Sequence, residues 1–223
     1  MLAIHFSVFG QHVCGLKASG GLSKISTTAD TNLTINKDCF AFSGAGGLYY
    51  NMRLKKSHLF GAELLFVLIR GKERSEVYES GQAGNLSGHY SINDTWRNVS
   101  YFGIPIYYGF KYKKLNINLG FQTLFTMKSK SRSKGLNGQN SVSVPYESRI
   151  NMPDIATYNY GPRAGAMYYI SKKISVEAIF YYGINTIYSA VNDKWRARQI
   201  TIGIRYQLFY LEPDPKKLNA ILE

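Results

Sequence analysis

The sequence predicts an all-β fold, an eight-stranded antiparallel transmembrane β-barrel built as an up-and-down meander with short periplasmic turns and long external loops. Three observations predict it. Apolar and small or polar residues alternate with a period of two along most of the chain, which is typical of strands with two different faces. Several alternating segments exceed the roughly five or six residues usual in soluble strands. Short and long connections alternate without exception, as in bacterial outer-membrane barrels.

Composition narrows the alternatives. The chain has 223 residues, a net charge of +13, 45% hydrophobic residues and only 2 Cys. A chain with this share of hydrophobic residues is not intrinsically disordered. Two cysteines are too few for a fold held together by disulfides. The longest strongly apolar run, Leu64 to Ile69, is far shorter than the roughly 20 residues of a transmembrane helix.

Alternation marks each strand in turn. In the segment 98–112, for example, Phe102, Ile104 and Ile106 occupy one phase, and Gly103 and Pro105 the other. The same pattern predicts eight strands, at about 14–26, 41–54, 59–71, 98–112, 115–127, 157–170, 174–188 and 197–210.

The connections give the orientation. Lys-Lys sequences occupy the three short ones, and the others are long and polar. Short turns are periplasmic and long loops external in outer-membrane barrels. We therefore expect external loops at 27–40, 72–97, 128–156 and 189–196.

A soluble lipocalin-like barrel would also alternate, but with its apolar phase inside. Here the apolar phase is bulky and aromatic in several strands, while the other phase is small or polar. A narrow eight-stranded lumen cannot hold so many rings, so the rings are expected to face lipid. Tyrosines near the strand ends are expected to form an interfacial girdle; these are Tyr49, Tyr50, Tyr112, Tyr168, Tyr169, Tyr188 and Tyr210.

The ends of the chain lie outside the expected barrel, which covers 12–210. Residues 1–11 are apolar up to Gly10 and suggest a truncated signal peptide, although no basic residue precedes them. A first β-strand is the alternative. Cys14 does not follow the small apolar residues of a lipid-anchor site. Residues 211–223 are expected to form a short periplasmic tail.

The residues resemble the outer-membrane β-barrel domain family of the Bacteroidota, the PorT-like group. The likeness covers most of 13–210, and its most specific parts are Ile104-Pro105 and the repeated Lys-Lys turns. It implies an outer-membrane location and no catalytic role for most members, and one branch is associated with type IX secretion. The segments that carry the likeness are 15–26, 42–66, 101–122, 160–185 and 200–209.

Five inward-facing charges are the main candidate site. Counting from the turns places Glu63, Glu177, Arg205, Arg163 and Lys17 at similar heights in the lumen. An unpaired charge there would be costly. We expect a structural ion-pair network centred on Glu177 and Arg205, with Arg163 beside Glu177, that blocks the lumen to solutes.

A second candidate site is the basic run Lys128, Lys130, Arg132 and Lys134, expected in an external loop. Anionic outer-membrane lipids and lipopolysaccharide are natural counter-charges, and a merely solvated loop is the alternative. The basic residues of the chain form no single face, so nucleic-acid binding is not expected. The remaining partner expected is the barrel-assembly machinery during folding, and the protein is expected to be monomeric.

Catalysis is not expected. A nucleophilic serine needs a nearby base, and only His89, beside Ser87, Ser91 and Asp94, could supply one in a loop. No cluster has metal-ligand spacing, and no cofactor is expected. The sequence therefore favours a non-enzymatic outer-membrane protein with a structural or interaction role through its external loops. An accessory of a secretion apparatus is the first alternative, and a surface hydrolase the second.

The two cysteines are expected to lie at opposite ends of the barrel, Cys14 at the start of the first strand and Cys39 just before the second. A disulfide requires Cα atoms within about 7 Å of each other. We therefore expect no bond between them.

Overall fold

A computed structural model describes residues 11–29, 34–55, 57–79, 89–139, 142–151, 155–190 and 193–211. They form ten antiparallel strands in one sheet. The strands are β1 (Gln11–Ala29), β2 (Thr34–Lys55), β3 (His58–Glu79), β4 (His89–Tyr112), β5 (Leu115–Gln139), β6 (Val142–Asn151), β7 (Tyr158–Tyr169), β8 (Ile174–Tyr182), β9 (Tyr188–Ala190) and β10 (Asp193–Leu211).

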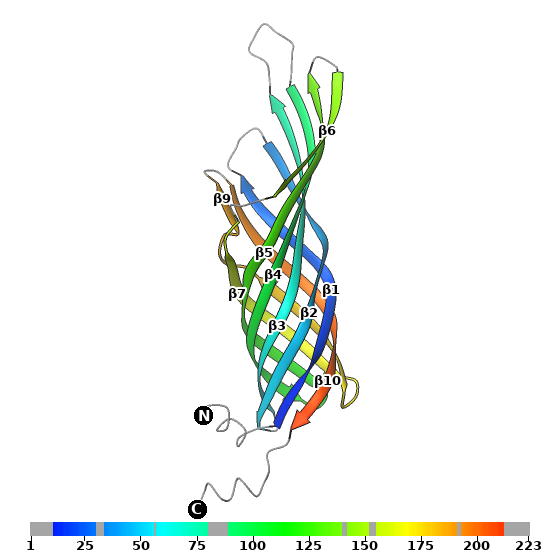
Figure 1. Cartoon of the computed structure of the whole chain (residues 1–223), viewed down its shortest axis with the longest axis vertical. Helices are drawn as coiled ribbons and strands as arrows, with labels where there is room; N and C mark the ends of the chain where they lie inside the picture. Colours follow the sequence, from blue (N-terminus) through cyan, green and yellow to red (C-terminus); the bar gives the residue numbers. More distant parts are fainter. Residues whose placement is uncertain are drawn as a thin grey trace, which may run out of the picture.

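Eight of these strands close into a ring, which confirms the predicted fold. Each strand pairs with the next in the order β1-β2-β3-β4-β5-β7-β8-β10, and pairing of β1 with β10 closes the ring. β6 pairs with β5 and β9 with β10, both outside the ring. β1 begins and β10 ends at the same end of the barrel, opposite the tips of β3 to β6 (Figure 1).

Most of the two longest predicted loops, 72–97 and 128–156, is strand. β3 and β4 stay paired as far as Glu79 and His89, and β5 and β6 as far as Gln139 and Val142. Polar composition led to the loop prediction. Beyond the bilayer, however, both faces of a hairpin meet water, so its strands need no apolar face. Cys39, expected before the second strand, lies within β2 for the same reason.

The predicted strand 174–188 is interrupted instead of continuous. β8 ends at Tyr182, and the side chain of Asn185 then takes over the hydrogen bonds of the neighbouring backbone. Its Oδ1 accepts from Tyr160 N at 2.8 Å, and its Nδ2 donates to Tyr158 O at 2.9 Å. Side-chain amides of this kind compete with ladder pairing, so the chain resumes as β9.

The predicted chain ends lie largely outside the described residues. Of the expected signal peptide, only Gln11 is described; it begins β1 and pairs with Arg53. Of the expected tail, only Leu211 is described, and it ends β10.

The two faces of the barrel wall differ as expected. On β10, the side chains of Ile200, Ile202 and Ile204 are 51%, 66% and 58% exposed, whereas Thr201 and Arg205 point inward and are buried. An apolar outer face suits lipid and a polar inner face a small lumen. No helix in the described part of the chain is long and apolar enough to span a membrane.

The tyrosine girdle is only partly correct. Tyr112 and Tyr168 are exposed on the outer face. Tyr49, however, is buried in the lumen, Tyr169 lines the periplasmic mouth, and Tyr188 stacks on a tryptophan with ring centroids 4.5 Å apart. Position near a strand end does not fix which face a residue occupies; the phase of the alternation does.

The lumen is layered, as the inward-facing residues of β3 show. From the periplasmic end, they include Glu63, the apolar side chains of Leu65, Val67 and Ile69, and finally Glu73, and all five are buried. The apolar layer is part of a cluster on several strands, which the prediction of a small and polar lumen missed. Its members are Ile25, Leu65, Val67, Ile69, Val99, Tyr101, Leu124, Tyr181, Ile187, Trp195 and Ala197.

Candidate functional site: a buried ion-pair network

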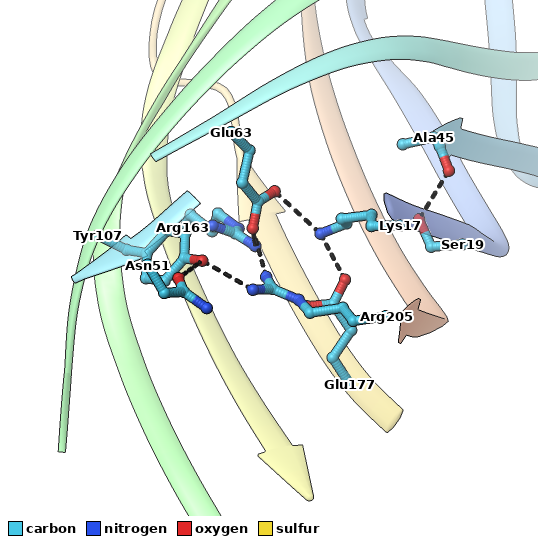
Figure 2. Close-up of polar contacts among 9 residues, drawn as sticks. All are labelled: Lys17, Ser19, Ala45, Asn51, Glu63, Tyr107, Arg163, Glu177 and Arg205. Carbon is cyan, nitrogen blue, oxygen red and sulfur yellow. Dashed lines mark hydrogen bonds and ion pairs between the residues drawn. The ribbon is translucent and has the colours of Figure 1, made fainter. Parts of the chain in front are cut away.

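The five charged residues singled out in the sequence lie together in the lumen. Lys17 comes from β1, Glu63 from β3, Arg163 from β7, Glu177 from β8 and Arg205 from β10. No side chain among them is more than 1% exposed. Figure 2 shows them converging from the barrel wall toward one another.

Glu63 is the centre of this network. Its Oε2 lies 3.0 Å from Lys17 Nζ, and its Oε1 lies 3.0 Å from Arg163 Nη2. Arg205 Nη2 also donates to Glu63 Oε1. Glu177 accepts from Arg205 Nε at 2.6 Å and pairs with Lys17. Lys17 and Arg205 are therefore shared by both carboxylates (Figure 2).

The predicted pair of Glu177 and Arg205 is present, and Arg205 also binds Glu63, which contacts one more cation than Glu177 does. Arg163 contacts Glu63, not Glu177, although β7 is the neighbour of β8. Counting along strands gives the height of each side chain in the barrel. It does not give contacts across a lumen so narrow that β3 and β7 side chains meet.

Tyr107 and Asn51 extend the network, and the sequence analysis did not single them out. Arg205 Nη1 donates to Tyr107 Oη at 2.8 Å, and Tyr107 Oη donates to Asn51 Oδ1 at 2.7 Å. The Cζ atom of Arg163 lies 4.6 Å from the centre of the Tyr107 ring. The tyrosine thus accepts a hydrogen bond from one arginine and stacks on the other, which lowers the cost of burying both cations.

Glycine makes room for Tyr107 and was the signal that could have revealed it. Tyr107 pairs with Gly61 on β3 and with Gly120 on β5. A Cβ atom on Gly61 would lie 2.2 Å from the Tyr107 ring, and one on Gly120 would lie 2.5 Å from Tyr107 Cβ. Inward-phase glycines on the two strands that flank an inward-phase tyrosine indicate a ring lying across them.

A second ion pair caps the apolar layer toward the external end. Arg97 on β4 pairs with Glu73 on β3, and its Cζ atom lies 3.9 Å from the centre of the Trp195 ring. Both charged residues are only 6% exposed. The lumen therefore contains, in order, an ionic layer, an apolar layer and a second ionic pair, an arrangement that suits a rigid plug.

The basic run of the sequence lies on β5 instead of in a loop. Lys128 and Lys130 are exposed just beyond the exposed Met127, the last large apolar residue of that face before the charges begin. Arg132 and Lys134 both bind Glu147 of β6, at 2.8 and 3.3 Å.

Glu147 also accepts from Arg149, at 3.0 Å. The hydrogen bonds from Arg132 and Arg149 are the main cause that holds the pKa of Glu147 at about 2. The external hairpin of β5 and β6 therefore keeps a single carboxylate ionised among three cations.

The residues considered for a hydrolase fall partly outside the described residues. Asp94 lies 3.0 Å from Lys72 Nζ, so its carboxylate is paired with a cation. His89 begins β4, and Ser87 lies outside the described residues. The described residues also contain no group of three His, Cys, Asp or Glu that could hold a metal ion. Both Cys14 and Cys39 are free thiols.

Several solved structures resemble the chain at low sequence identity. Neisserial surface protein A (NspA) is 14% identical with a TM-score of 0.37, over 89% of this chain and 97% of NspA. Ail, the attachment invasion locus protein of Yersinia pestis, is 8% identical with a TM-score of 0.35, over 88% and 99%. The outer membrane protease OmpT of Escherichia coli is 10% identical with a TM-score of 0.36, over 89% and 96%. No curated protein sequence matches the chain.

The family follows from a direct match to the sequence. The model of the outer membrane protein beta-barrel domain matches residues 14–189, most of the chain. The closed ring, the apolar outer face and the match place the protein in the bacterial outer membrane. The chain belongs to the outer membrane protein beta-barrel domain family.

Proposed function

We propose that the protein is a non-enzymatic interaction module of the cell surface, acting through the sheet that β3 to β6 form outside the barrel. The observation that carries this proposal is the continuation of strand pairing beyond the apolar wall, to Glu79 and His89 in one hairpin and to Gln139 and Val142 in the other. A paired sheet is a stiffer platform than a loop, so its side chains keep fixed positions toward a partner.

The partner chemistry proposed for this sheet is anionic. Four cations are exposed on the external part of β5 and β6: Lys128, Lys130, Lys134 and Arg149. Glu147 forms ion pairs with the last two of them. Lys128 and Lys130 are exposed directly beyond the last exposed apolar residue of this face, Met127. Basic clusters next to a membrane attract anionic headgroups.

A plugged lumen supports an interaction role over transport. The ionic and apolar layers fill the lumen with buried side chains from all around the ring. Purified protein in planar bilayers should therefore give no steady ion conductance, and a stable open channel would contradict the plug.

The interaction proposal is tested by the lipopolysaccharide that accompanies the purified protein. Lys128→Gln combined with Lys130→Gln should reduce the lipopolysaccharide that co-purifies from native membranes, and added salt should reduce it further because exposed charges are screened. Lys113→Gln with Lys172→Gln, at the periplasmic end, is the matched control and should leave it unchanged. Equal retention by both double variants would contradict the proposal.

Two other functions rest on narrower grounds. A place in the PorT-like branch, as an accessory of a secretion apparatus, rests on the sequence resemblance and would require co-purification with periplasmic machinery. A hydrolase would require loss of activity in His89→Ala, and the pairing of Asp94 with Lys72 disfavours it.

A further inference from the structure

The periplasmic end of the barrel is hollow and basic. A cavity of about 590 Å³ opens there between the strand ends and the turns. No acidic residue lines it within the described part of the chain. Its cationic lining residues are Arg53, Lys111, Lys113, Lys114 and Lys172. We call this cavity the basic mouth.

The cations of the basic mouth stand at two depths. Arg53 of β2 and Lys111 of β4 lie on the strands, and both stack on the ring of Tyr169, with Arg53 Cζ 5.8 Å and Lys111 Nζ 4.7 Å from its centre. Lys113 and Lys172 lie further out, in the β4–β5 and β7–β8 turns. Positive charge therefore lines a path from the rim into the barrel.

The basic mouth is closed at its inner end. Between Tyr169 and Arg205 the remaining space is only about 10 Å³, room for about one water at most. Above it lies the buried ion-pair network. The lumen therefore offers no passage to a ligand that enters from the periplasm.

Size and lining indicate the kind of ligand. A volume of about 590 Å³ is far more than one phosphate ion needs. Ile170 and Tyr210 add apolar surface to the cationic lining. A short chain with carboxylates spaced along it, and aliphatic stems between them, would satisfy cations at both depths and the apolar surface together.

We propose that the basic mouth binds an acidic peptide segment of a periplasmic protein, with one carboxylate between Arg53 and Lys111 and others at the turn lysines. Charge-assisted hydrogen bonds to carboxylates are stronger than neutral ones, and a concave site lined by one sign of charge concentrates the opposite charge. This site lies at the opposite end of the molecule from the external sheet, so it stands or fails separately from the function proposed above.

The test uses the full chain in a zwitterionic detergent and a fluorescein-labelled hexaglutamate peptide, with binding followed by fluorescence anisotropy at low salt. Arg53→Gln with Lys111→Gln removes the inner pair and should weaken binding at least tenfold. Lys113→Gln with Lys172→Gln removes two rim charges and should weaken it several-fold. Because Lys113 and Lys172 lie in turns, their double variant tests peptide binding by the basic mouth even if the Arg53 and Lys111 double variant fails to fold.

The matched control is Lys128→Gln with Lys130→Gln, which removes the same charge from the external end and should change binding less than twofold. Equal weakening by the external and periplasmic pairs would show attraction to net charge alone and overturn the proposal. Absence of hexaglutamate binding, with or without binding of pyrophosphate as a second probe, would also overturn it.

Discussion

Glu63 on β3 and Arg163 on β7 are 100 residues apart in the chain, yet they meet across the lumen with Glu63 Oε1 and Arg163 Nη2 3.0 Å apart. β3 and β7 are not neighbours in the ring, so this contact spans the barrel instead of running along its wall. It ties opposite sides of the cylinder together where the charges have least access to water.

Replacement of Glu63 should destabilise the barrel more than replacement of Glu177. Glu63 contacts three cations and Glu177 contacts two, so Glu63→Gln leaves more buried positive charge without a counter-ion. Losing one partner of a buried pair typically costs about 3–5 kcal/mol. The free energy of unfolding, measured by urea titration of tryptophan fluorescence in lipid vesicles, should fall by that order for Glu63→Gln and by less for Glu177→Gln.

A double variant separates lost pairing from lost packing. Arg163 forms its ion pair with Glu63, so Glu63→Gln with Arg163→Met removes one charge of each sign and should recover part of the stability lost by Glu63→Gln alone. Additive losses would show that the two residues do not interact energetically.

Gly61→Val should destabilise the network without changing any charge. A Cβ atom at residue 61 would lie 2.2 Å from the Tyr107 ring, so the ring must move away from Arg205 and Asn51. Overpacking of this kind typically costs about 1–3 kcal/mol. The same urea titration should show the loss, whereas Gly46→Ala should be nearly neutral, because a Cβ atom there would meet its nearest neighbour at 3.6 Å.

The native cysteines should report the orientation of the barrel. Cys39 is exposed on the part of β2 nearest the external end, and Cys14 is half-buried near the periplasmic end of β1. A membrane-impermeant maleimide added to intact cells should label the wild-type chain, and Cys39→Ser should abolish the labelling. Labelling that survives in Cys39→Ser but is lost in Cys14→Ser would invert the orientation.

Acid should loosen the external hairpin only at very low pH. Hydrogen bonds from Arg132 and Arg149 hold the pKa of Glu147 at about 2, below its value of about 4.3 in an unfolded chain. The contribution of this carboxylate is therefore complete above about pH 4.3 and is lost as the pH falls toward 2. The measurement is cleavage between β5 and β6 by an acid-stable protease. Cleavage of the wild type should increase as the pH falls over that range, whereas cleavage of Glu147→Gln should not change with pH.

The strands and their faces could be predicted because a period of two is a local property of the sequence. β5 illustrates the limit: its lipid-facing half alternates and was predicted, whereas its external half around Lys130 and Arg132 is polar on both faces and read as a loop. Pairing there depends on the partner strands β4 and β6, which no single segment reveals.

The ion-pair network could be predicted from the sequence to a similar extent. Counting along each strand gives the inward phase and the height of a side chain, so the set of residues could be named. These residues are Lys17, Glu63, Arg163, Glu177 and Arg205. Which carboxylate stands at the centre depends on distances across the lumen, and these follow from the size and tilt of the whole barrel.

The sharing of Lys17 and Arg205 by the two carboxylates has a consequence for how the barrel assembles. Lys17 belongs to the first strand of the ring and Arg205 to the last, and they stand directly opposite each other in the seam that joins β1 to β10. Until that seam forms, Glu63 and Glu177 lack a full set of counter-ions in a medium that penalises isolated charge. The charges therefore stabilise the closed cylinder more than any single hairpin, and we expect insertion into the bilayer and joining of the two chain ends to be coupled.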